Sequence, residues 1–164
     1  MFNLGKKKKE LKLDAKLYAP VSGRMIPLEE VSDPVFAQKI MGDGYAVEPA
    51  DSKIVSPVTG EIIAKQKHAL GFKRADGLEV LLHLGIDTVG LEAAPFKLKV
   101  SVGDIVEAGD ALGTADWTQV EAAGLPKTTL ILITNTANKL AELNLTAKTG
   151  QVSAGDVVGE AAAK

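Results

Sequence analysis

The sequence predicts an all-β protein, an antiparallel β-sandwich or barrel with duplicated hairpin elements and one or two short helices. Turn-forming residues interrupt short apolar runs roughly every 8–12 positions, a spacing typical of such folds. Two pairs of segments repeat, residues 18–23 with 55–60 and residues 100–106 with 152–158. Because only 4% of the residues are aromatic, we expect an aliphatic core.

Length and composition narrow the class of protein. A chain of 164 residues is long enough for a single core. The absence of cysteine excludes disulfides, thiolate catalysis and cysteine-ligated zinc. The net charge of -2 argues against nucleic acid as a partner. No apolar run reaches the roughly 18 residues of a membrane span, so we expect a cytoplasmic protein.

The N-terminal segment differs in charge from the rest of the chain. Residues 1–16 hold six lysines against Glu10 and Asp14, so they carry +4 and residues 17–164 carry -6. We therefore predict a flexible basic tail, residues 1–16, before one folded domain, residues 17–164. Weak contact of the tail with an anionic membrane surface is the alternative to a solvated tail.

Two segments carry the start and stop signals of short helices. Residues 33–42 begin with an N-cap aspartate and a first-turn proline and end in glycine, which predicts two turns with Phe36 and Ile40 on one face. Residues 116–124 have a similar cap and stop around Trp117. Each apolar face is expected either to join the core or to dock a partner.

One of the two histidines lies in a predicted half-buried strand, residues 78–86. Alternate residues of this strand are apolar, so the positions between them, which include Leu81 and His83, point away from the core. Asp87 continues on the same side as His83.

The second histidine, His68, lies in the preceding strand-like segment, and residues 74–77 have the composition of a hairpin turn. A four-residue loop would pair His68 with His83, whereas a turn at residues 76–77 would pair His68 with Gly85. In both registers the two imidazoles share one face, where opposed Cβ atoms lie about 4.5–5.5 Å apart. The sequence therefore predicts a histidine pair.

A histidine pair is compatible with more than one chemistry. Imidazole acts as a general base, as a metal ligand and as a nucleophile that forms a covalent intermediate. A zinc-dependent hydrolase using His68, His83 and Asp87 is one reading, since a catalytic zinc needs three protein ligands and an open position. A buried structural histidine is another reading for His68.

The segment 77–89 resembles the phosphorylation-site signature of the glucose-family IIA component (EIIA type 1) of the bacterial phosphoenolpyruvate-dependent sugar phosphotransferase system. The resemblance extends over most of the chain, through residues 19–23, 33–37, 41–46, 56–60 and 67–69. It implies a phosphocarrier that accepts a phosphoryl group on His83 from the histidine carrier HPr. The IIB domain of a IIBC sugar permease then receives the group on a cysteine. A regulatory role in carbon metabolism and the identity of the sugar stay open.

The resemblance also implies roles for individual residues. The carbonyl of Gly85 fixes the tautomer of His83, so that Nε2 is phosphorylated, and His68 donates a hydrogen bond to the phosphoryl oxygens. Many relatives have threonine where Gln66 stands, and the threonine hydroxyl orients the second histidine. In this chain the side-chain carbonyl of Gln66 would take that role and support the phosphoryl site together with Gly85. No cofactor is required, although His68 and His83 could bind adventitious or regulatory zinc.

A partner-binding rim is expected around the two histidines. Asp33 and Asp87 match acids that flank the family's site and would pair with basic groups of a partner. An exposed apolar patch marks a partner site. We expect that patch to consist of Phe36, Ile40, Leu70, Phe72 and Leu81.

Overall fold

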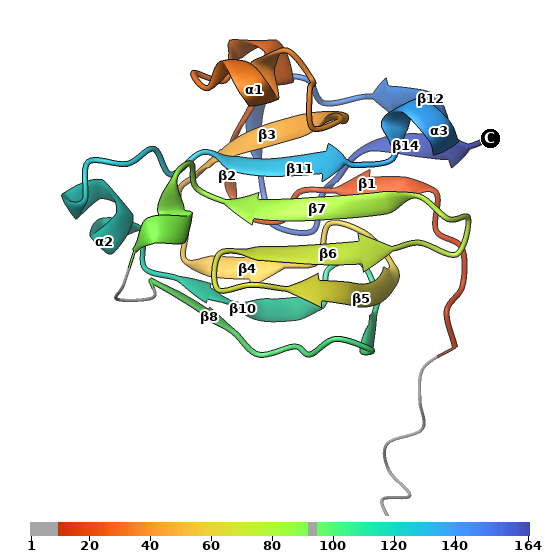
Figure 1. Cartoon of the computed structure of the whole chain (residues 1–164), viewed down its shortest axis with the longest axis horizontal. Coiled ribbons are helices and arrows are strands. Elements are labelled where there is room, and N and C mark those ends of the chain that lie inside the picture. Colours follow the sequence, from red (N-terminus) through yellow and green to blue (C-terminus); the bar gives the residue numbers. More distant parts are fainter. Residues whose placement is uncertain (1–9, 92–94) are drawn as a thin grey trace, which may run out of the picture.

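The computed structural model describes residues 10–91 and 95–164. Within these ranges the strands form three antiparallel sheets, stacked as a sandwich (Figure 1). The large sheet has the order β13 (Gly150–Val152), β2 (Gly23–Ile26), β3 (Asp43–Pro49), β11 (Thr129–Ile133), β7 (Glu79–Leu84), β6 (Ala69–Lys73), β5 (Gly60–Lys65) and β9 (Ile105–Val106). The smaller sheets have the orders β1 (Lys16–Tyr18), β14 (Val157–Ala163), β12 (Leu140–Leu145) and β4 (Lys53–Val55), β10 (Ala111–Ala115), β8 (Phe96–Leu98). The predicted all-β class is confirmed.

The strand order of the large sheet is symmetric about the pair β11–β7, with β3, β2 and β13 on one side and β6, β5 and β9 on the other. The repeated segments 18–23 and 55–60 make equivalent hydrogen bonds to each other. Tyr18 N donates to Pro57 O at 3.0 Å, and Val55 N donates to Pro20 O at 2.8 Å. The main chain of residues 155–156 bonds to Ala19 in the same way that residues 109–110 bond to Ser56. The structural counterpart of residues 152–158 is therefore residues 106–112. The pairing of 152–158 with 100–106 that the sequence suggested is wrong.

The three Gly-Asp turns explain that error. Asp104, Asp110 and Asp156 each accept a hydrogen bond from the backbone N–H three residues earlier, at 2.8–2.9 Å. Because all three turns use the same local chemistry, sequence alone cannot distinguish which two are related by the duplication.

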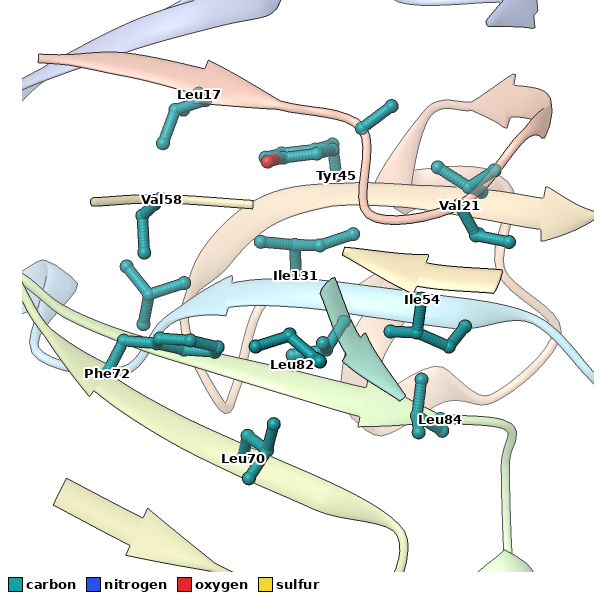
Figure 2. Close-up of a cluster of buried hydrophobic side chains, with 14 of the residues drawn as sticks. Leu17, Val21, Tyr45, Ile54, Val58, Leu70, Phe72, Leu82, Leu84 and Ile131 are labelled. Atoms are coloured by element: carbon teal, nitrogen blue, oxygen red, sulfur yellow. The ribbon is translucent and has the colours of Figure 1, made fainter. Parts of the chain in front are cut away.

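The main core fills the space between the large sheet and the two smaller ones. Figure 2 shows its aliphatic side chains around Tyr45 and Phe72, as the composition predicted. A second, smaller cluster lies on the opposite face of the large sheet. It contains Ile26, Leu28, Val31, Phe36, Ala46, Ile86, Leu130 and Leu132.

Short helices cover this second cluster and the ends of the sandwich. They are the 3-10 turns η1 (Leu28–Glu30) and η2 (Thr88–Gly90) and the helices α1 (Pro34–Ala37), α2 (Trp117–Ala122) and α3 (Thr136–Lys139). Asp33 caps α1 by accepting from Val35 N, and Asp116 caps α2 by accepting from Thr118 N. Both predicted helix starts are confirmed, whereas α3 was not predicted.

Helix α1 is one turn long instead of two. Lys39 has a left-handed conformation, with φ of 62°, and its N–H bonds to Phe36 O while Ile40 N bonds to Val35 O. This pair of bonds is the Schellman motif, which ends a helix. Phe36 is therefore buried in the second cluster, while Ile40 is 67% exposed, and the two do not share a helix face.

Residues just before position 17 make contacts with the folded domain. Arg74 is buried, and its guanidinium donates to Ala15 O and Ala161 O and to the carboxylate of Asp76. Asp14 accepts from the Tyr18 hydroxyl at 2.6 Å. Residues 14–16 are thus held by the fold. Residues 10–13 of the predicted tail have no regular secondary structure, and residues 1–9 lie outside the described residues. None of the described helices is long and apolar enough to cross a membrane.

Candidate functional site

His83 lies on β7, on the face of the large sheet that carries the second cluster. It pairs with Ala69 on β6 and with Leu130 on β11, so small and aliphatic residues flank the ring on both sides. The alternate residues Val80, Leu82 and Leu84 are buried in the main core. The predicted orientation of His83, away from that core, is confirmed, and the side chain is half-buried.

The backbone of the following residues fixes the His83 ring. Nδ1 lies 2.7 Å from Gly85 O. A carbonyl oxygen only accepts, so Nδ1 carries the proton and donates, and the lone pair is on Nε2. Gly85 can offer its carbonyl here because it has a φ of +76°. An added Cβ would lie 2.5 Å from Thr88 Cγ2, so the site requires glycine on two grounds.

Thr88 supports this turn and was not singled out by the sequence analysis. Its side chain is buried, and its hydroxyl donates to Leu84 O at 2.6 Å. Ile86 N donates to Pro126 O at 3.0 Å, which ties the same turn to the segment before β11. A threonine directly after Gly-Ile-Asp was visible in the sequence, but its buried hydrogen bond depends on the tertiary turn.

His68 lies in the bend between β5 and β6, next to His83. Their ring centroids are 4.8 Å apart with an interplanar angle of 78°, so the predicted histidine pair is present. Neither predicted register is right, because β6 and β7 pair Lys73 with Glu79 and Ala69 with His83. His68 O accepts from Leu84 N at 2.8 Å, so its backbone faces Leu84. The ring reaches His83 because His68 lies in the bend before β6 begins. Side chains in this bend do not follow the alternation of a regular strand.

Burial keeps both imidazoles neutral over a wider pH range. Desolvation lowers the pKa of His83, and this effect outweighs the opposing effects of the Gly85 carbonyl, Asp87 and Asp33, which raise it. The pKa of His68 is lowered by desolvation and by the neighbouring His83. A neutral ring retains the lone pair that nucleophilic attack needs.

Two acids and an apolar surface surround the pair. Asp33, at the start of α1, and Asp87, in the turn after β7, are both near enough to His83 to raise its pKa. Phe36 packs against the His83 ring with centroids 5.6 Å apart, and Leu81 is half-buried against the second cluster. Further exposed apolar side chains on the same two segments are Val35, Met41 and Val89.

Two predicted rim residues are not at the surface. Leu70 and Phe72 are 1% and 0% exposed and belong to the main core. They pair with Leu82 and Val80, on the face opposite to His83. The expectation that they line the rim is wrong, because the observed register differs by one residue from both predicted ones and moves them to the core face.

Gln66 is exposed, and within residues 10–91 and 95–164 its side chain makes no hydrogen bond to His68. Only its backbone N–H is engaged, donating to Ala69 O at 2.9 Å. The described residues also contain no group of three or more His, Asp or Glu side chains able to hold a metal ion. A catalytic zinc on His68, His83 and Asp87 is therefore not supported.

A family profile for the phosphoenolpyruvate-dependent sugar phosphotransferase system, EIIA 1, matches residues 15–139. The chain belongs to this family. It is 42% identical over 156 residues to the glucose-specific EIIA component of Oceanobacillus iheyensis, covering 94% of this chain and 93% of that protein. It is 39% identical over 141 residues to the glucose-specific EIIA component of Staphylococcus aureus, covering 85% and 84% of the two chains.

Two further similarities concern domain context and fold. The chain is 47% identical over 151 residues to the glucose-specific EIICBA component of Streptococcus pneumoniae, but spans only 20% of that longer protein. The structure of glucose permease IIA from Mycoplasma capricolum superposes with a TM-score of 0.76 at 35% identity, covering 88% of this chain and 93% of that one. The EIIA resemblance seen in the sequence is confirmed, and the chain is a phosphocarrier component of the sugar phosphotransferase system.

Proposed function

We propose that His83 is the residue that carries the phosphoryl group, and that it does so on Nε2. The observation that supports this most directly is the hydrogen bond from His83 Nδ1–H to Gly85 O. This bond keeps the proton on Nδ1, which does not attack, and leaves the lone pair of Nε2 free to attack phosphorus. The lowered pKa of His83 keeps that lone pair available near neutral pH.

The reaction is a transfer between two imidazoles. The P–N bond of a phosphohistidine on the donor protein breaks, and a bond forms from phosphorus to His83 Nε2. The donor ring, which carries a proton on its other nitrogen, leaves as a neutral imidazole and gives up its positive charge. The His83 ring gains that charge because Nδ1 keeps its proton. Gly85 O, Asp33 and Asp87 all favour that positive charge. Positioning and electrostatic stabilisation of this kind are the main contributions of a protein to phosphoryl transfer.

His68 is proposed to assist the second transfer, in which phosphorus moves from His83 Nε2 to a cysteine of a IIB domain. Its ring lies 4.8 Å from that of His83, within reach of a group attached to Nε2. An N–H of His68 would donate to a phosphoryl oxygen as the thiolate attacks and the N–P bond breaks. Among the described residues the Gln66 side chain makes no hydrogen bond that would support this step. Its proposed role is therefore only to stabilise the bend, through the hydrogen bond from its backbone N–H to Ala69 O.

Partner proteins would dock on the surface formed by α1, the turn after β7 and Leu81. Ile40, Val35 and Val89 are 67%, 40% and 73% exposed there, which is unusual for large apolar side chains. Asp33 and Asp87 lie at the same surface and would pair with basic groups. We propose HPr as the donor and the IIB domain of a IIBC permease as the acceptor, both met in the cytoplasm.

The test is intact-protein mass after incubation with phosphoenolpyruvate, enzyme I and HPr. The wild-type chain is expected to gain one phosphoryl group that requires HPr and is lost in acid. His83→Gln should gain none, because the nucleophile is absent. His68→Gln should still be phosphorylated but should transfer onward to a IIB domain at a much lower rate.

Circular dichroism of both variants provides the control, since a loss of phosphorylation counts only for a folded protein. Retained phosphorylation of folded His83→Gln would refute the site assignment. Unchanged onward transfer by His68→Gln would refute the role of the second histidine. Binding of adventitious zinc by the pair stays a separate prediction, which isothermal titration with zinc would check.

A further inference from the structure

A basic hollow is lined in part by the three residues that directly precede His68 in the chain. Its volume is about 440 Å3, and its lining residues are Lys65, Gln66, Lys67, Phe96, Lys97 and Leu98. Three of the six are lysines and none is acidic, in a chain whose net charge is -2. Of the two apolar lining residues, Phe96 is buried and Leu98 is half-buried.

The hollow lies on the opposite side of the histidines from α1. The second cluster, which lies under α1, contains residues of β2, β3 and β11. The next strand across the large sheet is β7, which carries His83, and after it come β6 and β5, joined by the bend that carries His68. Lys67 directly precedes His68, and Lys65 Nζ donates to Leu98 O at 3.2 Å, which holds the hollow between β5 and β8. Figure 1 shows the same order, with α1 above β3 and β11 and the turn between β5 and β6 at the opposite side of β7.

The other half of the pseudo-symmetric fold provides an internal comparison. A hollow of about 270 Å3 is lined there by Leu143, Asn144 and Leu145 of β12, the counterparts of Phe96, Lys97 and Leu98 of β8, and by Lys39 and Lys148. Lys39 Nζ lies 3.1 Å from a Glu29 oxygen and 3.4 Å from an Asp43 oxygen, so acids of the chain compensate that lysine.

Among the described residues, the lysines that line the first hollow have no such compensation. In residues 10–91 and 95–164, none of Lys65, Lys67 and Lys97 forms a salt bridge to an acidic side chain. No acidic side chain of the described residues therefore compensates the charge of these three lysines. A set of uncompensated lysines next to a protein-docking site favours acidic groups on the partner.

We infer that the phosphoryl acceptor domain presents acidic side chains that enter this lysine hollow when it docks. The inference rests on the proposed function, in which two partners use the surface around His83 in succession. Asp33, Asp87 and the apolar residues of α1 would serve both partners. The hollow adjoins His68, the residue proposed to act in the onward transfer, and so it is assigned to the acceptor. Acidic groups on one side and basic groups on the other would set the acceptor's orientation around the His83–phosphoryl axis.

The experiment measures both transfers for the double variant Lys67→Glu/Lys97→Glu. A IIB domain that the wild-type chain phosphorylates is the acceptor, and phospho-HPr is the donor. We expect KM for the acceptor to rise about five- to twentyfold, the effect of reversing two exposed charge pairs, while KM for the donor changes less than about twofold. Added salt should raise the acceptor KM of the wild-type chain and have little effect on that of the variant.

The matched control is Lys148→Glu/Lys164→Glu, which makes the same charge change away from the hollow and should leave both KM values unchanged. Equal rises for donor and acceptor, or no rise for the acceptor, would overturn the inference. So would binding of the wild-type chain to vesicles of anionic lipid that the double substitution abolishes without changing the acceptor KM. If phospho-HPr does not phosphorylate the wild-type chain, the proposed function fails first, an outcome distinct from selective loss of the acceptor effect.

Discussion

Replacement of Gly85 by alanine should damage both the stability and the chemistry of the site. Gly85 has a φ of +76°, where alanine costs about 1–2 kcal/mol relative to glycine. The new Cβ would lie 2.5 Å from Thr88 Cγ2 and 3.1 Å from Pro126 O. Overpacking of this kind costs about 1–3 kcal/mol. Thr88 cannot simply turn aside, because its buried hydroxyl is bonded to Leu84 O. The expected loss in the free energy of unfolding is about 2–5 kcal/mol.

The same substitution should slow phosphorylation of His83. Relieving the overlap moves the Gly85 carbonyl away from Nδ1, and the ring then loses the acceptor that stabilises its positive charge. A hydrogen bond to a charged group contributes about 1.5–3 kcal/mol, which corresponds to a rate loss of about 10- to 150-fold. Urea denaturation measures the first effect, and single-turnover phosphorylation by phospho-HPr measures the second.

Gly90→Ala is the matched control for Gly85→Ala. Gly90 has no positive φ, and among the described residues no heavy atom beyond its chain neighbours lies within 4 Å of the position that an added methyl group would take. The change should therefore be within about 0.5 kcal/mol of neutral. If Gly85→Ala were no less stable than Gly90→Ala and were phosphorylated at the wild-type rate, the argument that this turn fixes the His83 tautomer would be refuted.

Two further predictions concern buried charge and pH. Arg74→Leu removes the donor to Ala15 O and Ala161 O and leaves the Asp76 carboxylate without its ion pair, so urea denaturation should show a loss of about 3–5 kcal/mol in the free energy of unfolding. The control Arg24→Leu, at an exposed position, should show little loss. Equal effects of the two substitutions would contradict the role of Arg74. Both histidines have folded-state pKa values below 6.5, so their contribution to stability is complete above pH 6.5 and is lost as pH falls through those values. NMR titration of the rings should give midpoints below 6.5, and Phe36→Ala should move that of His83 upward by exposing the ring; a wild-type midpoint above 6.5 would contradict this account.

The sequence was sufficient to predict features that depend on short-range patterns. The period of two through residues 78–86 placed His83 on the face away from the main core, and the capping aspartates located the starts of α1 and α2. The family signature around His83 was also sufficient to identify the EIIA family. These features persist in the fold because they arise from neighbouring residues, whose geometry the backbone sets directly.

Tertiary contacts decided the register of the hairpin that carries both histidines, and with it the composition of the rim. Arg74 is held in the interior by hydrogen bonds to the carbonyls of Ala15 and Ala161, which are far away in the sequence. The connection between β6 and β7 is therefore one residue longer than the four-residue loop considered, and Leu70 and Phe72 face the core. His68 still meets His83, because it lies in a bend where strand alternation has ended. A rule based on local turn residues cannot include a buried arginine whose partners are distant strands.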